Sequence, residues 1–154
     1  MPYMVKDLST DGSDRGGRII RVYSKTETDS ISTSRDLGWD VVDSDTDCAV
    51  VDGKVGYCVP STYHGWKINN VIAGVHTKGV TGTMDIQIRR RRAGTDNDVL
   101  STKVTVGDEF YAADGVVDED YNTMATGDII FIDIDTVHTT PAKGLFVTLT
   151  LVSS

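Results

Sequence analysis

Hydrophobic and polar residues alternate along most of the second half of the chain. The clearest segments are residues 84–89, 99–106, 128–135 and 144–151, in which branched and aromatic side chains recur at every second position. A period of two is typical of half-buried β-strands, and Gly, Asp, Asn and Pro separate these segments as they commonly separate strands. The pattern therefore predicts that this half of the chain is built from short strands.

Similar segments extend the pattern towards the N-terminus, so we expect eight strands from Trp39 onwards. They are residues 39–42, 48–51, 55–59, 66–75, 83–90, 99–106, 128–135 and 144–151. No segment has apolar residues at a helical period over three turns, and the one long gap, residues 107–127, has room for a single helical turn near residues 118–124. The sequence predicts an all-β fold, an antiparallel jelly roll or β-sandwich of about eight strands.

The first 38 residues have a different composition. Residues 11–17 are rich in turn formers, and residues 24–36 contain one apolar side chain, Ile31. Such polar tracts bury too little to offset the entropy of ordering. Between them, residues 18–23 form one plausible strand. We expect an N-terminal arm and polar connector (1–38), ordered only against a neighbour, before a sandwich domain (39–154). A meandering surface loop of the same domain is the alternative.

Net charge and hydropathy limit the kinds of partner that the chain is expected to bind. The 154 residues carry a formal net charge of −8, with 23 acidic and 15 basic side chains. We therefore do not expect the net basic face that nucleic-acid binding needs. The negative charge instead favours solubility, or docking on a basic partner. The chain has no run of about 18 apolar residues that would predict a membrane span. Its start lacks a signal-peptide pattern, so we expect synthesis in a cytoplasm without Sec export.

The two cysteines, Cys48 and Cys58, flank a predicted hairpin turn at Asp52 and Gly53. A two-residue loop places Cys48 opposite Tyr57, and a three-residue loop places it opposite Cys58. Only the second register could permit a disulfide. In a reducing compartment we expect two free, largely buried thiols.

No catalytic, metal or cofactor site emerges from the sequence. The histidines His64, His76 and His138 fall in no zinc-ligand pattern. Residues 43–47 begin like a calcium loop, but the sixth position is Cys48 and the twelfth is Lys54, which breaks the template. Trimeric dUTPases are also all-β and of this length, yet their phosphate-binding segments have no match here.

Asp133 and Asp135 share one face of a predicted strand, as a carboxylate pair in a glycosidase could. The alternative is that the two carboxylates simply lie on the solvated face of the strand, opposite the core residues Ile130, Ile132 and Ile134. No accompanying nucleophile or base can be assigned. We therefore do not predict an enzyme.

The run Arg89-Arg-Arg-Arg92 is the most conspicuous charge cluster. On a strand, Arg89 and Arg91 share the face of Asp85 and Gln87. Arginine pairs well with carboxylates across protein interfaces, so these side chains could contact acidic strands of a neighbouring subunit. The alternative is an arginine-rich strand end in water with local ion pairs.

From about Val50 to the end, two-thirds of the chain resembles a recurrent type of tailed-bacteriophage virion protein. The likeness is carried by Asp52-Gly-Lys54, Tyr57-Cys-Val-Pro60, residues 70–77, 81–94 and 98–106, Thr126-Gly-Asp-Ile-Ile-Phe-Ile-Asp-Ile-Asp135 and residues 142–151. Similar sequences are jelly-roll modules of head decoration (cement) proteins and of tail-fibre or spike tips. The resemblance thus implies a jelly roll in a virion.

Two functions follow from the resemblance. The first is a capsid decoration protein that binds the major capsid protein at the outer head surface as a homotrimer. The short chain and the lack of a repetitive shaft favour it. Its candidate capsid or subunit contacts are Tyr3, Arg15, Arg18, Arg21, Arg89 and Arg91.

The second function is a fibre-tip module that binds a host-surface carbohydrate. Its candidate residues are the aromatic side chains Tyr63, His64, Trp66 and Tyr121, for which ordinary strand-edge packing is the structural alternative. A carbohydrate-active or other enzyme is a residual alternative.

Overall fold

The chain folds into two facing antiparallel sheets. The structure is a computed structural model and describes residues 33–154. Its strands are β1 (Ser34–Asp40), β2 (Val51–Cys58), β3 (Lys67–Thr77), β4 (Met84–Arg92), β5 (Thr95–Asp98), β6 (Leu100–Thr102), β7 (Val104–Val106), β8 (Ala112–Asp114), β9 (Val116–Val117), β10 (Ile129–Thr136) and β11 (Lys143–Val152). A single 3-10 turn, η1 (Ser61–Tyr63), is the one helical element in this range.

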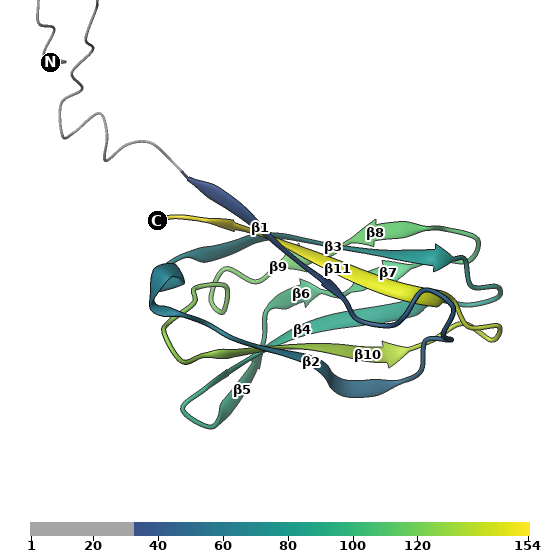
Figure 1. The fold of residues 1–154 in the computed structure, drawn as a ribbon, viewed down its shortest axis with the longest axis horizontal. Coiled ribbons are helices and arrows are strands. Elements are labelled where there is room, and N and C mark those ends of the chain that lie inside the picture. The colour runs from purple at the N-terminus through teal and green to yellow at the C-terminus, as the bar shows by residue number, and fades with distance from the viewer. Residues whose placement is uncertain (1–32) are drawn as a thin grey trace, which may run out of the picture. The chain divides into compact units, whose positions relative to one another are not determined.

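The strand order is that of a jelly roll. Sheet A has the order β1-β11-β3-β8, and sheet B has the order β2-β10-β4, with β5 and β7 both paired to β4. The chain crosses between the sheets repeatedly, because β1, β3, β8 and β11 lie in sheet A while β2, β4, β7 and β10 lie in sheet B. Two antiparallel sheets connected in this way confirm the predicted jelly roll, in which β1, β11, β3 and β8 face β2, β10, β4 and β7. Figure 1 shows the two layers edge-on.

Alternation of side chains explains why the sheets pack. On β11, Leu145, Val147, Leu149 and Leu151 are fully buried, while Phe146 and Thr148 point away from the core. On β10 the predicted apolar stripe is buried as well, at Ile130, Ile132 and Ile134. Each such side chain contributes about 1.5–3 kcal/mol when it leaves water. The residues that recur at a period of two in the sequence are therefore the ones that form the core between the sheets.

The expected hairpin at Asp52 and Gly53 is wrong. Residues 51–58 form one strand, β2, and residues 48–50 are not in a strand. Gly53 adopts a left-handed φ of 63°, and its N–H donates to the Asp133 carboxylate. Three β2 residues between Val51 and Val55 thus face a single β10 residue, which is a β-bulge. The glycine bends a strand here rather than ending it.

The cysteines are unpaired, as expected, but differ in burial. Cys48 is buried and Cys58 is exposed on β2, so the expectation of two largely buried thiols holds for Cys48 alone. Burial raises the pKa of the Cys48 thiol.

Three further boundaries differ from expectation. β1 begins at Ser34, so residues 34–38, assigned above to the connector, lie in the first strand of sheet A. The single expected strand 99–106 is divided into β6 and β7, because the mini-sheet β6–β9 diverges from sheet B. Residues 118–121 form a hydrogen-bonded turn rather than a helical one. The predicted strand 18–23 lies outside the described residues.

Three loops meet at one end of the sandwich, on the right in Figure 1. They connect β3 to β4, β7 to β8 and β10 to β11. Glu109 N–H donates to the Gly79 carbonyl oxygen, and Val80 and Thr140 form a bridge. The ring of His138 is buried between these loops, and its Nε2 lies 3.2 Å from the Gly107 carbonyl oxygen.

Candidate interaction surfaces

The arginine run is divided between the two faces of β4. Arg89 and Arg91 lie on the outer face of sheet B, where both guanidinium groups stack on the ring of Phe131, at 4.7 and 5.0 Å from its centroid. Arg89 makes a two-pronged ion pair with Asp133, with Nε–Oδ2 of 2.7 Å and Nη2–Oδ1 of 3.0 Å. Its Nη1 donates to Asp96 on β5, which also accepts two hydrogen bonds from Arg91.

These contacts stabilise the charged forms. Hydrogen bonding to Asp133 raises the pKa of Arg89. The two hydrogen bonds from Arg91, and after them the one from Arg89, lower the pKa of Asp96 to about 2. A planar guanidinium fork suits such two-pronged pairing. The outer face of sheet B therefore carries a connected network of charges with an aromatic ring at its centre.

Arg90 and Arg92 point towards the segment before β10. Arg90 Nη1 donates to the carbonyl oxygens of Tyr121 and Thr123, each at 2.9 Å. Arg92 makes a two-pronged ion pair with the buried Asp128, at 2.6 and 2.8 Å. Burial opposes ionisation of Asp128, but the hydrogen bonds from Arg92 and from the Ala125 N–H outweigh it and lower the pKa of Asp128. These two arginines hold the loop that precedes β10.

The ion pairs of Arg89 and Arg91 occupy side chains that were expected to contact another subunit. Three nitrogens of Arg89 and two of Arg91 donate hydrogen bonds to carboxylates of the same chain. An acidic strand of a neighbouring subunit would have to compete with Asp96 and Asp133 for these guanidinium groups. The ion pairs within the chain are those expected in the alternative interpretation, an arginine-rich strand end with local ion pairs. Contact through Arg89 and Arg91 stays a prediction. The other expected contacts, Tyr3, Arg15, Arg18 and Arg21, lie outside the described residues.

The four candidate receptor-binding residues come from two adjoining segments. Residues 65–68 and 122–124 are hydrogen-bonded to each other, which brings the η1 turn beside the loop after β9. Tyr63 and Trp66 are half-buried, pack against the core and meet edge to face with centroids 5.1 Å apart. His64 accepts a hydrogen bond from the Thr126 N–H, and the exposed Tyr121 lies over Arg90. Tyr63 and Trp66 therefore serve packing, whereas His64 and Tyr121 are exposed.

An exposed pair of aromatic side chains was missed by the sequence interpretation. Phe110 and Tyr111 are 65% and 57% exposed in the loop 107–111, called here the aromatic loop. Lys78 forms an ion pair with Glu109 at 2.8 Å and lies over the Tyr111 ring. The Thr81 N–H donates to Asp108 at 2.8 Å. Two adjacent aromatic residues in a turn-rich gap were the signal that could have indicated this surface.

The aromatic loop is held in a costly conformation. Glu109 has a φ of 62° and Thr81, in the facing loop, a φ of 63°. Left-handed backbone at non-glycine residues costs on the order of 1 kcal/mol and is often found at binding sites. The two side chains are thus presented on a fixed backbone, which lowers the entropy lost when a surface binds them.

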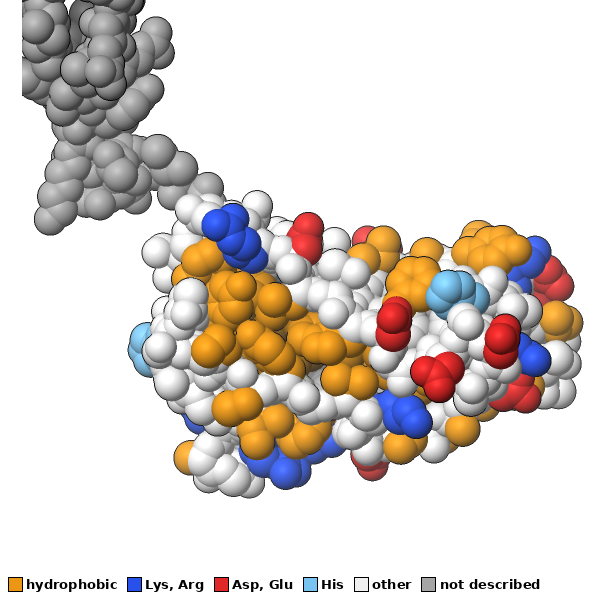
Figure 2. All heavy atoms as spheres, viewed as in Figure 1, with side chains coloured by type: hydrophobic (Ala, Val, Ile, Leu, Met, Phe, Trp, Pro, Cys, Tyr) orange, Lys and Arg blue, Asp and Glu red, His pale blue; other side chains and the backbone are white. Residues whose placement is uncertain are grey.

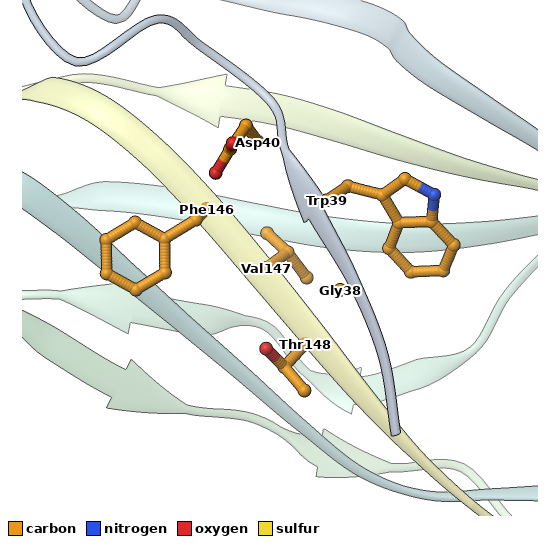
Figure 3. A pocket seen from close by; sticks show the side chains of 6 residues that line it. All are labelled: Gly38, Trp39, Asp40, Phe146, Val147 and Thr148. Carbon is orange, nitrogen blue, oxygen red and sulfur yellow. The ribbon is translucent and has the colours of Figure 1, made fainter. Parts of the chain in front are cut away.

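A shallow depression lies on the opposite edge of sheet A. It has a volume of about 250 Å³ and is lined by Gly38, Trp39, Asp40, Phe146, Val147 and Thr148 of β1 and β11. In Figure 3, the side chains of Asp40 and Thr148 lie on either side of Gly38 and Val147, and Phe146 points away from β1. We call it the β1–β11 depression.

The Phe146 ring is fixed on the side away from β1. It lies over Gly74, where an added Cβ would be 2.4 Å from its Cε2 atom, and it meets His76 edge to face. Phe146 remains 39% exposed. The side of the ring that faces β1 borders the β1–β11 depression, whose lining is mixed because Asp40 and Thr148 are polar.

The open side of the sandwich is apolar as well. Figure 2 shows a broad hydrophobic area between β1 and β2, which are the edge strands of their sheets. Half-buried hydrophobic residues of these strands pack against the core there: Leu37, Trp39, Val51, Val55 and Tyr57. Trp39 and Tyr57 meet edge to face across the gap between the sheets. Free strand edges next to apolar side chains are common sites of protein association.

The polar groups considered for catalysis have structural partners. Asp133 pairs with Arg89 and Asp135 with Lys103, so the two carboxylates belong to separate ion pairs. Among the described residues no group of three or more His, Cys, Asp or Glu side chains is placed to hold a metal. Within the same range no helix is long and apolar enough to cross a membrane.

No protein-family model matches the chain, and no curated protein matches it significantly in sequence.

Proposed function

We propose that the protein is a virion structural protein of a tailed bacteriophage that decorates the outer surface of the head as a homotrimer and stabilises the shell. The observation that carries the proposal is a jelly roll with apolar side chains exposed at its edges, in the aromatic loop beside β8 and in the area between the edge strands β1 and β2. The resemblance of residues 50–154 to phage virion jelly rolls supports the same function.

Decoration of this kind needs complementary surfaces rather than a reacting group. A trimer presents three copies of each contact around one axis, so contacts that are weak singly act together. Molecules that bind only the closed shell raise the free energy needed to open it. The −8 net charge favours docking on basic regions of the major capsid protein.

The N-terminal arm is proposed to reach over neighbouring capsid subunits. Removal of residues 1–17 is then expected to abolish binding to heads and to leave the sandwich folded. Unchanged occupancy of heads by the truncated protein would contradict this part of the proposal.

Binding to phage heads that lack decoration tests the function. Purified protein is mixed with such heads, and the bound fraction is measured after the heads are sedimented. Saturable binding with a fixed ratio to the major capsid protein is expected. Protein that ignores heads and adsorbs to host cells would refute decoration.

A fibre-tip module is the second candidate, because residues 63–66 and Tyr121 are brought together by the pairing of residues 65–68 with 122–124. For this function, Tyr121→Ala should reduce adsorption to host cells and leave head binding unchanged.

A further inference from the structure

The outer face of sheet A can be read row by row from the strand register. Residues paired directly across neighbouring strands point to the same side of a sheet, so the register shows which side chains share this face. They lie in three rows: Asp40, Phe146, Gly74 and Ala112; Gly38, Thr148, Ile72 and Asp114; and Asp36, Thr150 and Asn70. Figure 3 shows the part of the face that β1 and β11 form.

The centre of this face is apolar. Ile72 on β3 and Phe146 on β11 are diagonal neighbours and are 43% and 39% exposed. Small residues surround them, namely Gly38, Gly74 and Ala112. No bulky group therefore keeps a broad partner away from the two side chains. Neighbouring exposed hydrophobic residues with a polar rim are typical of protein association sites.

The edges of the face carry three carboxylates and no cation. Asp36 and Asp40 lie on β1 and Asp114 lies on β8, so they flank the centre from both sides. Asp36 accepts a hydrogen bond from Thr150 Oγ1 at 2.8 Å. The carboxylates of Asp40 and Asp114 have no hydrogen-bond or ion-pair partner in the described part of the chain. The three rows contain no lysine or arginine, and Lys67 follows only beyond the third row, at the start of β3.

The outer face of sheet B has a different distribution of charge. There, arginines of β4 and Lys103 form ion pairs with Asp96, Asp133 and Asp135. Most of the negative charge on that face is thus neutralised within the chain. On sheet A the carboxylates are left without a cation, so a partner has to supply it.

We propose that the outer face of sheet A docks on a basic protein surface, whose lysine or arginine side chains meet the three carboxylates around an apolar contact with Ile72 and Phe146. The inference rests on the proposed function, in which the partner is a basic region of the major capsid protein, and it names the face that meets the head. An apolar centre with a polar rim is usual in protein interfaces. Complementary charges at the rim fix the orientation of the partner and speed its association.

The charge of the face disfavours other occupants. Unpaired carboxylates repel the phosphates of nucleic acids and the headgroups of anionic lipids. A second copy of this chain carries the same net charge of −8, and its Arg89, Arg91 and Arg92 are already ion-paired within the chain. A cationic surface of a different protein is the occupant that the charges favour.

Two triple variants of equal net charge test the face. Each replaces three carboxylates by amides of the same shape and changes the formal net charge from −8 to −5. The face variant combines Asp36→Asn, Asp40→Asn and Asp114→Asn. The control variant combines Asp52→Asn, Glu119→Gln and Asp120→Asn, which are exposed and lie outside the three rows. Far-UV circular dichroism should show the same β signal for both variants and the wild type.

Binding to decoration-free heads is measured by co-sedimentation at a series of salt concentrations. Wild-type binding should weaken as salt is added, because salt screens exposed charge pairs. At low salt the face variant should bind roughly 10-fold more weakly, the effect of losing three exposed ion pairs, and its binding should depend less on salt. The control variant should stay within about twofold of the wild type, since its carboxylates lie outside the contact.

Ile72→Thr tests the apolar centre. It keeps a β-branched side chain on β3 but removes apolar surface from the contact. Binding to heads should weaken several-fold with an unchanged salt dependence. Val116→Thr makes the same kind of change at a side chain that is 56% exposed on β9, outside the face, and should bind as the wild type does. Equal losses in the two variants would contradict an apolar contact at Ile72.

A layer of poly-L-lysine provides a cationic surface that needs no heads. The wild type and the control variant should be retained on it more strongly than the face variant, although both variants carry the same net charge. Equal binding of the two triple variants, to heads and to polylysine, would refute the docking face while head decoration stood. A wild-type protein that ignores heads would refute the proposed function. In that case weaker retention of the face variant on polylysine still supports a basic partner for this face, and equal retention refutes it.

Discussion

Replacement of Asp133 by alanine should destabilise the sandwich more than any other single change in the outer ion-pair network. Its carboxylate is 7% exposed and accepts hydrogen bonds from the Gly53 N–H and from two nitrogens of Arg89. The Gly53 N–H loses its acceptor at a part-buried position, which costs about 1–3 kcal/mol. Arg89 keeps Asp96 as a partner, so the loss of its pair costs less than the roughly 3–5 kcal/mol of a fully uncompensated buried charge.

The expected sum is about 3 kcal/mol, a large part of the roughly 5–15 kcal/mol by which domains are stable. For a domain of this size such a change lowers Tm by about 10 °C. Thermal unfolding followed by far-UV circular dichroism, with urea unfolding beside it, measures the difference. Asp133→Asn keeps an acceptor for Gly53 and should be intermediate.

Asp135→Ala is the matched control on the same strand. Asp135 pairs with Lys103 at 2.7 Å, and the two side chains are 26% and 44% exposed. Exposed ion pairs contribute about 0–1 kcal/mol, so this variant should unfold close to the wild type. An equal loss of stability in the Asp133→Ala and Asp135→Ala variants would refute the view that the Arg89–Asp133 ion pair and the β2 bulge form one structural unit.

Three further outcomes are expected. Because pairing with arginines lowers the pKa of Asp96 to about 2, its contribution to stability is present above about pH 4 and is lost as the pH falls towards 2; Tm measured against pH should fall less steeply in this window for Asp96→Asn. An aromatic disulfide reagent should titrate one thiol rapidly in the native protein, the exposed Cys58, and the buried Cys48 only after unfolding; two rapid thiols would contradict the burial. Gly79→Ala places a Cβ 2.2 Å from Nδ1 of the buried His138, so overpacking should cost about 1–3 kcal/mol in urea unfolding, and an unchanged midpoint would show that the ring moves freely.

The fold was predictable because the strands of a sandwich carry their own pattern. Alternation at Ile130, Ile132 and Ile134 marks which side chains enter the core, and the structure buries all three. The strand ends were less predictable. Asp52 and Gly53 are typical hairpin residues, but tertiary pairing with Asp133 uses the glycine for a bulge instead.

The surfaces were harder to predict than the core, since they depend on which loops meet. The four arginines were visible in the sequence, yet their partners are set by tertiary structure: Asp96 and Asp133 by the register of β5 and β10 against β4, and Asp128 by the turn before β10. Phe110 and Tyr111 lie in a segment without periodicity. Their exposure follows from contacts of their loop with residues 78–81, which no local pattern encodes.

The central claim, that the protein stabilises a phage head, is tested most directly by the temperature at which heads release their DNA. Decoration-free heads are heated with and without saturating protein, and a DNA-binding dye reports release. A higher release temperature is expected with the wild-type protein, and little or no rise with a variant that fails to form trimers. Heads that release DNA at the same temperature, with and without the bound protein, would contradict the claim.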